Sequence, residues 1–136
     1  MPMLDKRRER IAGFVMPQLE AGENVEVVVP TAQTGPSPVF GPLACMVFFA
    51  VRVYAPVLTG RRLLLLRCSK WTGRPKTIDA AYPRGEVRVE RYAPGSLWGK
   101  LTLSLPGSTL DLNVHRMVRT DTDSLTAALG RATSAA

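Results

Sequence analysis

The chain has 136 residues, of which 46% are hydrophobic and 21% charged, and its formal net charge is +7. This length fits one domain, and this composition excludes a disordered chain and a fibrous repeat. The positive charge favours an anionic partner, which can be phosphate, nucleic acid or anionic lipid.

The first predicted element is a helix over residues 4–20, because apolar side chains recur there at near-helical spacing opposite charged ones. Pro17 weakens the last turn of this helix. A strand over residues 25–29 follows, since valines alternate along it, and it closes at a proline. Residues 31–38 are rich in turn formers and predict a loop.

Residues 39–51 form a run of thirteen residues without a charged or strongly polar side chain. A transmembrane helix needs about 20 such residues, so this run is too short to span a bilayer alone. Two interpretations stay open, namely burial in the core or against a partner, and contact with a membrane interface. The candidate contact residues are Phe40, Leu43, Met46, Phe48 and Phe49.

Short strands separated by turn signals make up the remainder of the chain before a final helix. They are predicted over residues 51–58, 62–68, 76–81, 86–90, 101–105 and 110–115. The run Leu63–Leu66 predicts a strand covered on both faces, and Pro106-Gly107 predicts a hairpin between the last two strands. Thr120-Asp121 offers the N-cap of a helix that ends near Gly130.

Together with the first strand this gives seven strands and then one amphipathic helix. Short connections favour an antiparallel meander, and a single helix after it can plug one open end of a small barrel. We therefore expect a mainly β protein with a closed or nearly closed core. That core is predicted on the faces that carry Val25, Val53, Leu64, Val89, Leu103 and Leu112.

The whole net charge lies in one central segment. Residues 52–76 hold seven cations and no acid, whereas the rest of the chain holds eleven residues of each sign. Lys and Arg near a charged bilayer are attracted to anionic lipid at about 1 kcal/mol each, and Trp prefers membrane interfaces. The alternative is a solvated loop in which Trp71 packs onto the sheet. The predicted lipid or anion site consists of Arg52, Arg61, Arg62, Arg67, Lys70, Trp71, Arg74 and Lys76.

The two cysteines, Cys45 and Cys68, lie in apolar runs without a Cys-x-x-Cys spacing, and the chain has one histidine. A disulfide framework and a zinc site are therefore poorly supported, and we expect buried free thiols, no metal and no cofactor. The N-terminus shows no apolar stretch of secretory length with a cleavage site. We expect a cytoplasmic protein that can also associate with a membrane.

A catalytic interpretation would have to use His115, with Asp111 and Ser104 as partners. Alternate residues along one strand lie about 7 Å apart, so Asp111 and His115 are too distant for a triad bond. The sequence also contains no glycine-rich phosphate loop. We therefore expect no enzymatic activity.

Three stretches carry a resemblance to a known family. They are Gly22-Glu-Asn-Val25, the turn Thr59-Gly60-Arg61-Arg62 inside the run 58–66, and the hairpin over 101–112. With the seven strands and the final helix, they resemble bacterial pleckstrin-homology-like (PH-like) domains, in which such a turn joins the second and third strands. Gly60 stands where Asp or Asn is more usual, and the apolar insertion at 36–50 departs from a minimal domain of this type.

The resemblance implies a small barrel of about seven antiparallel strands capped by the C-terminal helix. It would occupy residues 21–132, after an N-terminal helix over 1–20 and before a tail over 133–136. Such domains bind anionic lipid heads, peptides or copies of themselves, and they offer no catalytic residues to transfer.

We therefore expect a non-catalytic binding or assembly module. The first hypothesis is contact with anionic membrane lipid through the basic loop and the apolar segment. The alternative is a structural subunit that buries residues 39–51 against a protein partner or another copy. Nucleic acid is the third and weaker option, because the sequence has no helix-turn-helix and few aromatics for base stacking.

Overall fold

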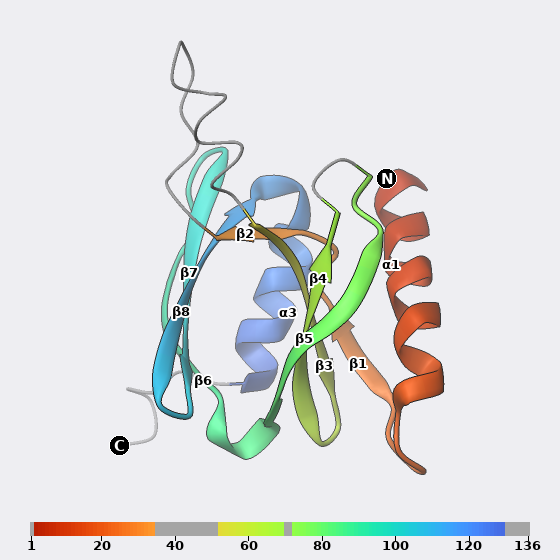
Figure 1. The fold of residues 1–136 in the computed structure, drawn as a ribbon. Helices are drawn as coiled ribbons and strands as arrows, with labels where there is room; N and C mark the ends of the chain where they lie inside the picture. Colours follow the sequence, from red (N-terminus) through yellow and green to blue (C-terminus); the bar gives the residue numbers. More distant parts are fainter. Residues whose placement is uncertain (1, 35–51, 70–71, 130–136) are drawn as a thin grey trace.

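The computed structural model describes residues 2–34, 52–69 and 72–129, which form a curved antiparallel sheet with two helices packed against it (Figure 1). The helices are α1 (Pro2–Val15) and α3 (Arg119–Leu129), and short 3-10 helices follow α1 and precede α3 at Met16–Gln18 and Arg116–Val118. The strands are β1 (Val25–Val28), β2 (Ala32–Thr34), β3 (Arg52–Thr59), β4 (Arg62–Cys68), β5 (Pro75–Pro83), β6 (Arg88–Ala93), β7 (Trp98–Leu105) and β8 (Ser108–His115). The mainly β fold with a helix at each end is confirmed.

The strands follow the spatial order β5-β4-β3-β2-β8-β7-β6, and every pair is antiparallel. β1 lies off this path and pairs with β3 as well. Val28 pairs with Val57 in the half of β3 near its end, and Thr34 pairs with Arg52 at its start. β1 and β2 therefore share β3 as a common partner along its length.

The sheet does not close into a barrel, which corrects the expectation of a closed or nearly closed one. Among the described residues no pairing joins β5 to β6, the two strands at the ends of the order. β5 has a proline at each end and two register shifts against β4, and such features turn an edge strand away from further pairing. The chain then leaves β5 through a 3-10 turn at Arg84–Glu86 before β6 begins.

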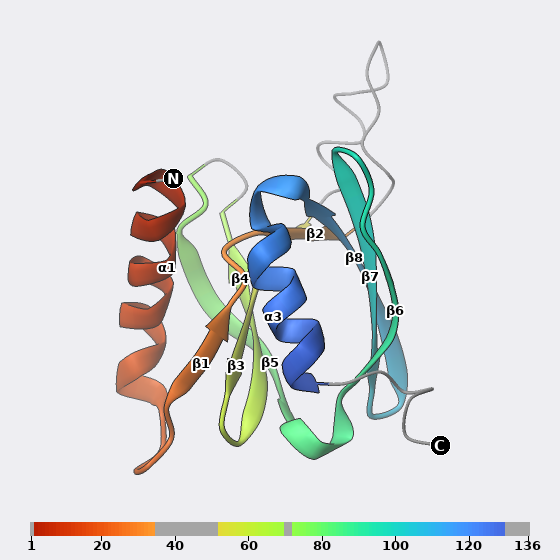
Figure 2. The same cartoon turned by 180° about the vertical axis from the view of Figure 1, so that it is seen from behind.

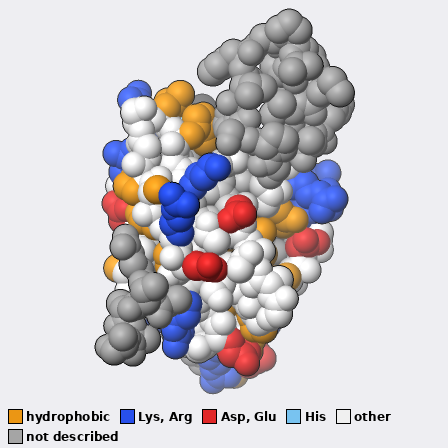
Figure 3. All heavy atoms as spheres, turned by 90° about the vertical axis from the view of Figure 1, so that its left-hand side faces the viewer, with side chains coloured by type: hydrophobic (Ala, Val, Ile, Leu, Met, Phe, Trp, Pro, Cys, Tyr) orange, Lys and Arg blue, Asp and Glu red, His pale blue; other side chains and the backbone are white. Residues whose placement is uncertain are grey.

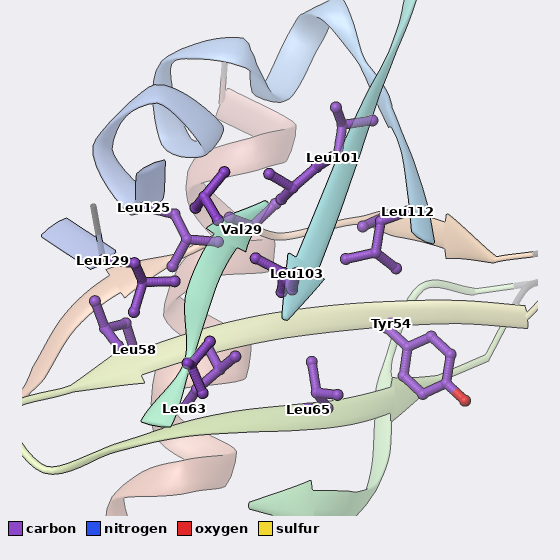
Figure 4. Close-up of a cluster of buried hydrophobic side chains, with 14 of the residues drawn as sticks. Val29, Tyr54, Leu58, Leu63, Leu65, Leu101, Leu103, Leu112, Leu125 and Leu129 are labelled. Atoms are coloured by element: carbon purple, nitrogen blue, oxygen red, sulfur yellow. The ribbon is translucent and has the colours of Figure 1, made fainter. Parts of the chain in front are cut away.

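The buried side chains form two clusters on opposite faces of β3 and β4. The inner cluster joins Leu58, Leu63 and Leu65 to the β6–β8 strands and to Leu125 and Leu129 of α3 (Figure 4). The outer cluster joins the alternate residues of β3 and β4 to α1. Its fully buried members include Ile11, Val15, Val57, Leu64 and Leu66. The prediction that Leu63–Leu66 is covered on both faces is confirmed.

The six residues predicted to form one core divide equally between the two clusters. Val53 and Leu64 lie in the outer cluster with Val25 at its margin, whereas Val89, Leu103 and Leu112 lie in the inner one. Alternation along a strand separates the two faces but does not show which face meets the distant strands. In strands that are buried on both faces, the hydropathy of the residues does not distinguish the face toward α1 from the face toward β6–β8.

Two predicted segments also differ in extent. The N-terminal α-helix ends at Val15 instead of residue 20, because Pro17 lies in the 3-10 turn that follows. The segment predicted as a loop from residue 31 contains β2, a three-residue strand in which Gln33 pairs with both Val53 and Asn113. The predicted hairpin of β7 and β8 is confirmed, with Gly107 in the left-handed conformation at its turn.

Helix α1 contributes to the core, so truncation of one of its buried side chains should destabilise the fold. We expect Ile11→Ala to lower the free energy of unfolding by about 3 kcal/mol, because the Ile11 side chain is fully buried against the outer face of the sheet. Met16→Ala is the control, since Met16 is 63% exposed just beyond the helix. Urea unfolding of both variants measures the difference, and equal stabilities would contradict the packing of α1.

Candidate functional site

Several cations gather where three neighbouring strands begin or end. β3 begins at Arg52, β4 ends at Cys68 and β5 begins at Pro75, and Cys68 is the register partner of both Val53 and Pro75. We call this region the cationic end of the molecule. It is defined by Arg7, Arg52, Arg67, Arg74 and Lys76.

The turn between β4 and β5 holds Arg74 in place through its own hydrogen bonds. The Ser69 amide donates to the Arg74 carbonyl at 2.9 Å, and the Gly73 amide donates to the Ser69 carbonyl at 2.7 Å. The Arg74 amide donates to Thr72 Oγ1 at 3.3 Å. Gly73 has a φ of +73°, a left-handed conformation that suits glycine. These hydrogen bonds hold the backbone of Arg74 in place between Thr72 and Ser69.

Four of the predicted site residues share this end. Arg52, Arg67, Arg74 and Lys76 are exposed, and none of them forms an ion pair with another described residue. Arg67 has Tyr54 and Thr77 as its register partners. The nearby acid Asp79 accepts a hydrogen bond from the Tyr54 hydroxyl at 3.4 Å. The positive charges at this end are therefore available to an external anion.

Arg7 of α1 is a further member, which the sequence analysis did not single out. A Cβ atom added at Gly73 would lie 3.0 Å from the guanidinium carbon of Arg7, so this side chain rests against the β4–β5 turn. Only the docking of α1 on the sheet brings residue 7 to residue 73. The basic run at residues 6–8 was the sequence signal, but it predicts a solvated helix face equally well.

Arg61 and Arg62 lie at the opposite end of β4 and form internal ion pairs. Arg62 contacts Glu23 through Nε at 2.9 Å and through a terminal nitrogen at 3.1 Å. The Thr59 hydroxyl donates to the same carboxylate at 2.6 Å, and Arg61 pairs with Glu20 at 3.0 Å. These two predicted site residues therefore connect the β3–β4 turn to the segment before β1, away from the cationic end.

The Glu23 carboxylate is the most strongly perturbed acid of this network. The hydrogen bond from Arg62 lowers the pKa of Glu23 from 4.5 to about 2, although burial opposes the shift. The hydroxyl of Thr59 and the amide of Glu20 add to the lowering. Glu23 is therefore ionised, and paired with Arg62, throughout the neutral pH range.

The remaining predicted contact residues lie outside the described residues. They are Lys70, Trp71, Phe40, Leu43, Met46, Phe48 and Phe49, together with Cys45. The flanks of both segments are described, however. Thr34 and Arg52 are register partners, so residues 35–51 leave from and return to the cationic end.

Cys68 is a buried free thiol, as predicted. Burial raises the pKa of Cys68 to about 11, while the positive charge of Arg7 acts in the opposite direction. At neutral pH the side chain is a protonated thiol, which is a poor nucleophile and a poor metal ligand.

The residues considered for catalysis have separate partners. Asp111 accepts a hydrogen bond from the Thr102 hydroxyl at 2.7 Å, and His115 Nδ1 accepts one from the Met117 amide at 3.1 Å. Ser104 lies opposite Thr109 and Arg88 in the sheet. The structure does not bring the three side chains into one site. In the described ranges, His, Cys, Asp and Glu side chains form no group of three able to hold a metal ion.

Comparison of the chain with family models, curated proteins and solved structures finds no match. In the described part of the chain, no helix has the length and apolar character needed to cross a bilayer. The interpretation of the site therefore depends on its own geometry and charge.

Removal of the buried carboxylate should destabilise the protein at neutral pH and less so in acid. We expect Glu23→Gln to lower the free energy of unfolding by about 2 kcal/mol, because Arg62 loses its anion at a largely buried site. The folded-state pKa of Glu23 lies below its ordinary value of 4.5, so this stabilisation is present above pH 4.5 and is lost as the pH falls toward 2.

Urea titrations of the wild type and of Glu23→Gln across this pH range measure the effect. The difference between their free energies of unfolding should become smaller as the pH falls. Glu20→Gln serves as the matched control, since its carboxylate is exposed and its ion pair should contribute less than about 0.5 kcal/mol. A gap that stays constant down to pH 2 would show that Glu23 does not titrate as described.

Proposed function

We propose that this protein is a non-catalytic module that binds anionic membrane lipid through its cationic end. The supporting observation is the convergence of five cations from α1, β3, β4, the β4–β5 turn and β5, without an ion-pair partner among the described residues. Positive charges that the fold does not neutralise are the feature that an anionic surface recognises.

The magnitude of this attraction suits reversible binding. Each cation near an anionic bilayer contributes about 1 kcal/mol, so five of them contribute about 5 kcal/mol at low salt. Salt screens charges beyond about 10 Å at 0.1 M, so the contribution falls at physiological ionic strength. Charge alone therefore gives weak binding, and stable attachment requires a second signal.

The apolar sequence of residues 39–51 is a candidate for this second signal. The described residues on either side of this segment, Thr34 and Arg52, pair with each other at the cationic end, so both of its attachment points lie there. An apolar segment combined with basic residues is the usual composition of a peripheral membrane contact.

The arrangement of the strands is compatible with the PH-like resemblance, which we retain as part of this proposal. Strands β2–β5 and strands β6–β8 each lie in consecutive order in the sheet, and the two groups meet where β2 pairs with β8. A helix follows the last strand. The resemblance carries the expectation of a module that binds anionic lipid heads, peptides or copies of itself, and the cations of the cationic end favour the first of these.

Reversal of the charges at the cationic end should abolish binding to anionic vesicles. We expect the wild type to sediment with phosphatidylcholine vesicles that contain phosphatidylglycerol, and less so as salt is added. The triple variant Arg67→Glu, Arg74→Glu and Lys76→Glu should stay in the supernatant, because attraction becomes repulsion at the contact surface.

The matched control reverses Arg10 of α1 together with Arg88 and Arg91 of β6, three exposed cations outside both the cationic end and the turn between β6 and β7. Both triples change the net charge by the same amount, so only the position of the charges differs. Equal loss in both variants would show that net charge, rather than the cationic end, governs binding. If the wild type bound no vesicle at any salt concentration, the proposal would be wrong, and a protein partner for residues 39–51 would become the better explanation.

A further inference from the structure

A second surface outside the cationic end combines exposed apolar side chains with cations. Three large hydrophobic residues of the described part are more than a third exposed, and two of them, Leu97 and Met117, are each 41% exposed and lie together. Leu97 belongs to the turn between β6 and β7, and Met117 to the 3-10 helix before α3. We call this surface the Leu97 patch. It consists of Leu97, Trp98, Arg116, Met117 and Arg119.

Hydrogen bonds hold the two segments of the patch together. The Arg116 amide donates to the Leu97 carbonyl at 2.9 Å, and the Arg119 guanidinium donates to the Gly95 carbonyl. The edge of the Trp98 ring meets the His115 ring with centroids 5.0 Å apart. The apolar side chains are therefore presented by a fixed backbone, so that little conformational entropy is lost when they are buried.

The Leu97 patch and the cationic end lie toward the same end of the sheet. Figures 1 and 2 are related by a turn about the vertical axis, and in both the β6–β7 turn, the start of α3 and the β4–β5 turn lie at the upper end. In the view toward β6–β8, hydrophobic side chains gather at the upper edge beside a cationic group, whereas charges of both signs are mixed lower on that face (Figure 3). Both regions therefore lie toward one end of the molecule.

The chemistry of the patch fits a lipid surface better than a small ligand. The cavity beside it, lined by Gly95, Gly99 and His115 among others, has a volume of about 10 Å³, which is the room of a single water. Arg116 and Arg119 are exposed and form no ion pair with a described residue. Exposed apolar side chains with arginines and a tryptophan close by in the chain can enter the interface while the cations meet the phosphates.

We propose that the Leu97 patch is a second membrane contact, which inserts Leu97 and Met117 into the interface of an anionic bilayer. This inference rests on the proposed function and adds to it a position and an orientation. Two contacts at one end fix how the domain sits on the membrane, with β6–β8 upright and the β3–β4 turn away from the lipid.

Fluorescence quenching tests whether the patch enters the bilayer. The chain has two tryptophans, so Trp71→Phe leaves Trp98 as the only one. Vesicles of phosphatidylcholine and phosphatidylglycerol with brominated acyl chains should quench Trp98 when the protein binds. Binding without quenching would overturn the inference while leaving the proposed function in place.

Sedimentation of Leu97→Ser, Met117→Ser with the same unlabelled vesicles is the second test. We expect about a tenfold weaker partition coefficient that persists at high salt, because the lost contribution is apolar. The control is Met16→Ser, which removes another exposed apolar side chain far from this end. An unchanged partition coefficient would overturn the inference. If the double variant instead dissociated a wild-type dimer in light scattering, the patch would be a contact between two copies.

The two proposals can fail separately. Loss of binding in the Arg67, Arg74 and Lys76 variant, combined with full binding of the Leu97 and Met117 variant, supports the proposed function and rejects the second contact. Absence of vesicle binding by the wild type rejects both.

Discussion

The burial of both faces of β3 and β4 is the constraint on which the remaining structure depends. Seven of the eight residues of β3 are buried, and so are all four leucines of the run 63–66. Burial of one leucine side chain stabilises the fold by about 2 kcal/mol before the loss of conformational entropy on folding is counted. One face needs α1 as its cover, and the other needs α3 and the strands β6–β8. The layers on both faces bury the apolar side chains of β3 and β4 without pairing between β5 and β6, which no described residue provides.

Some strands could be predicted from the sequence, whereas β2 and the division of the core into two clusters could not. Alternation and turn residues were sufficient for the β7–β8 hairpin and for the strand at 62–68, because their signals are local. β2 escaped detection, since three residues among turn formers carry no periodic signal and gain their partners only from β3 and β8. The expectation that Leu64 shares one core with Leu103 and Leu112 has the same origin, because the cover of Leu64 comes from α1, about fifty positions earlier in the chain.

The charge pattern of the sequence predicted the candidate site only in part. The sequence located the excess of cations in residues 52–76 but could not divide them, because β4 carries Arg62 and Arg67 to opposite ends of the sheet. Glu20 and Glu23 lie more than thirty positions away in sequence and take Arg61 and Arg62 into internal pairs. Among the residues that the structure describes, the cations of this segment without an ion pair form a smaller group, which Arg7 of α1 joins. Tertiary pairing thus separates cations that hold the fold together from cations that face outward.

Cys68 makes the layer between α1 and the sheet accessible to kinetic measurement. Its thiol is 5% exposed and belongs to the same cluster as Ile11 and Val15. A thiol reagent can reach the sulfur only when that layer opens, and the high pKa further slows reaction in the closed state. In a Cys45→Ser background, the labelling rate therefore reports the opening free energy of the N-terminal helix separately from global unfolding. The protein carries its own probe of local stability at the point where α1 meets β4.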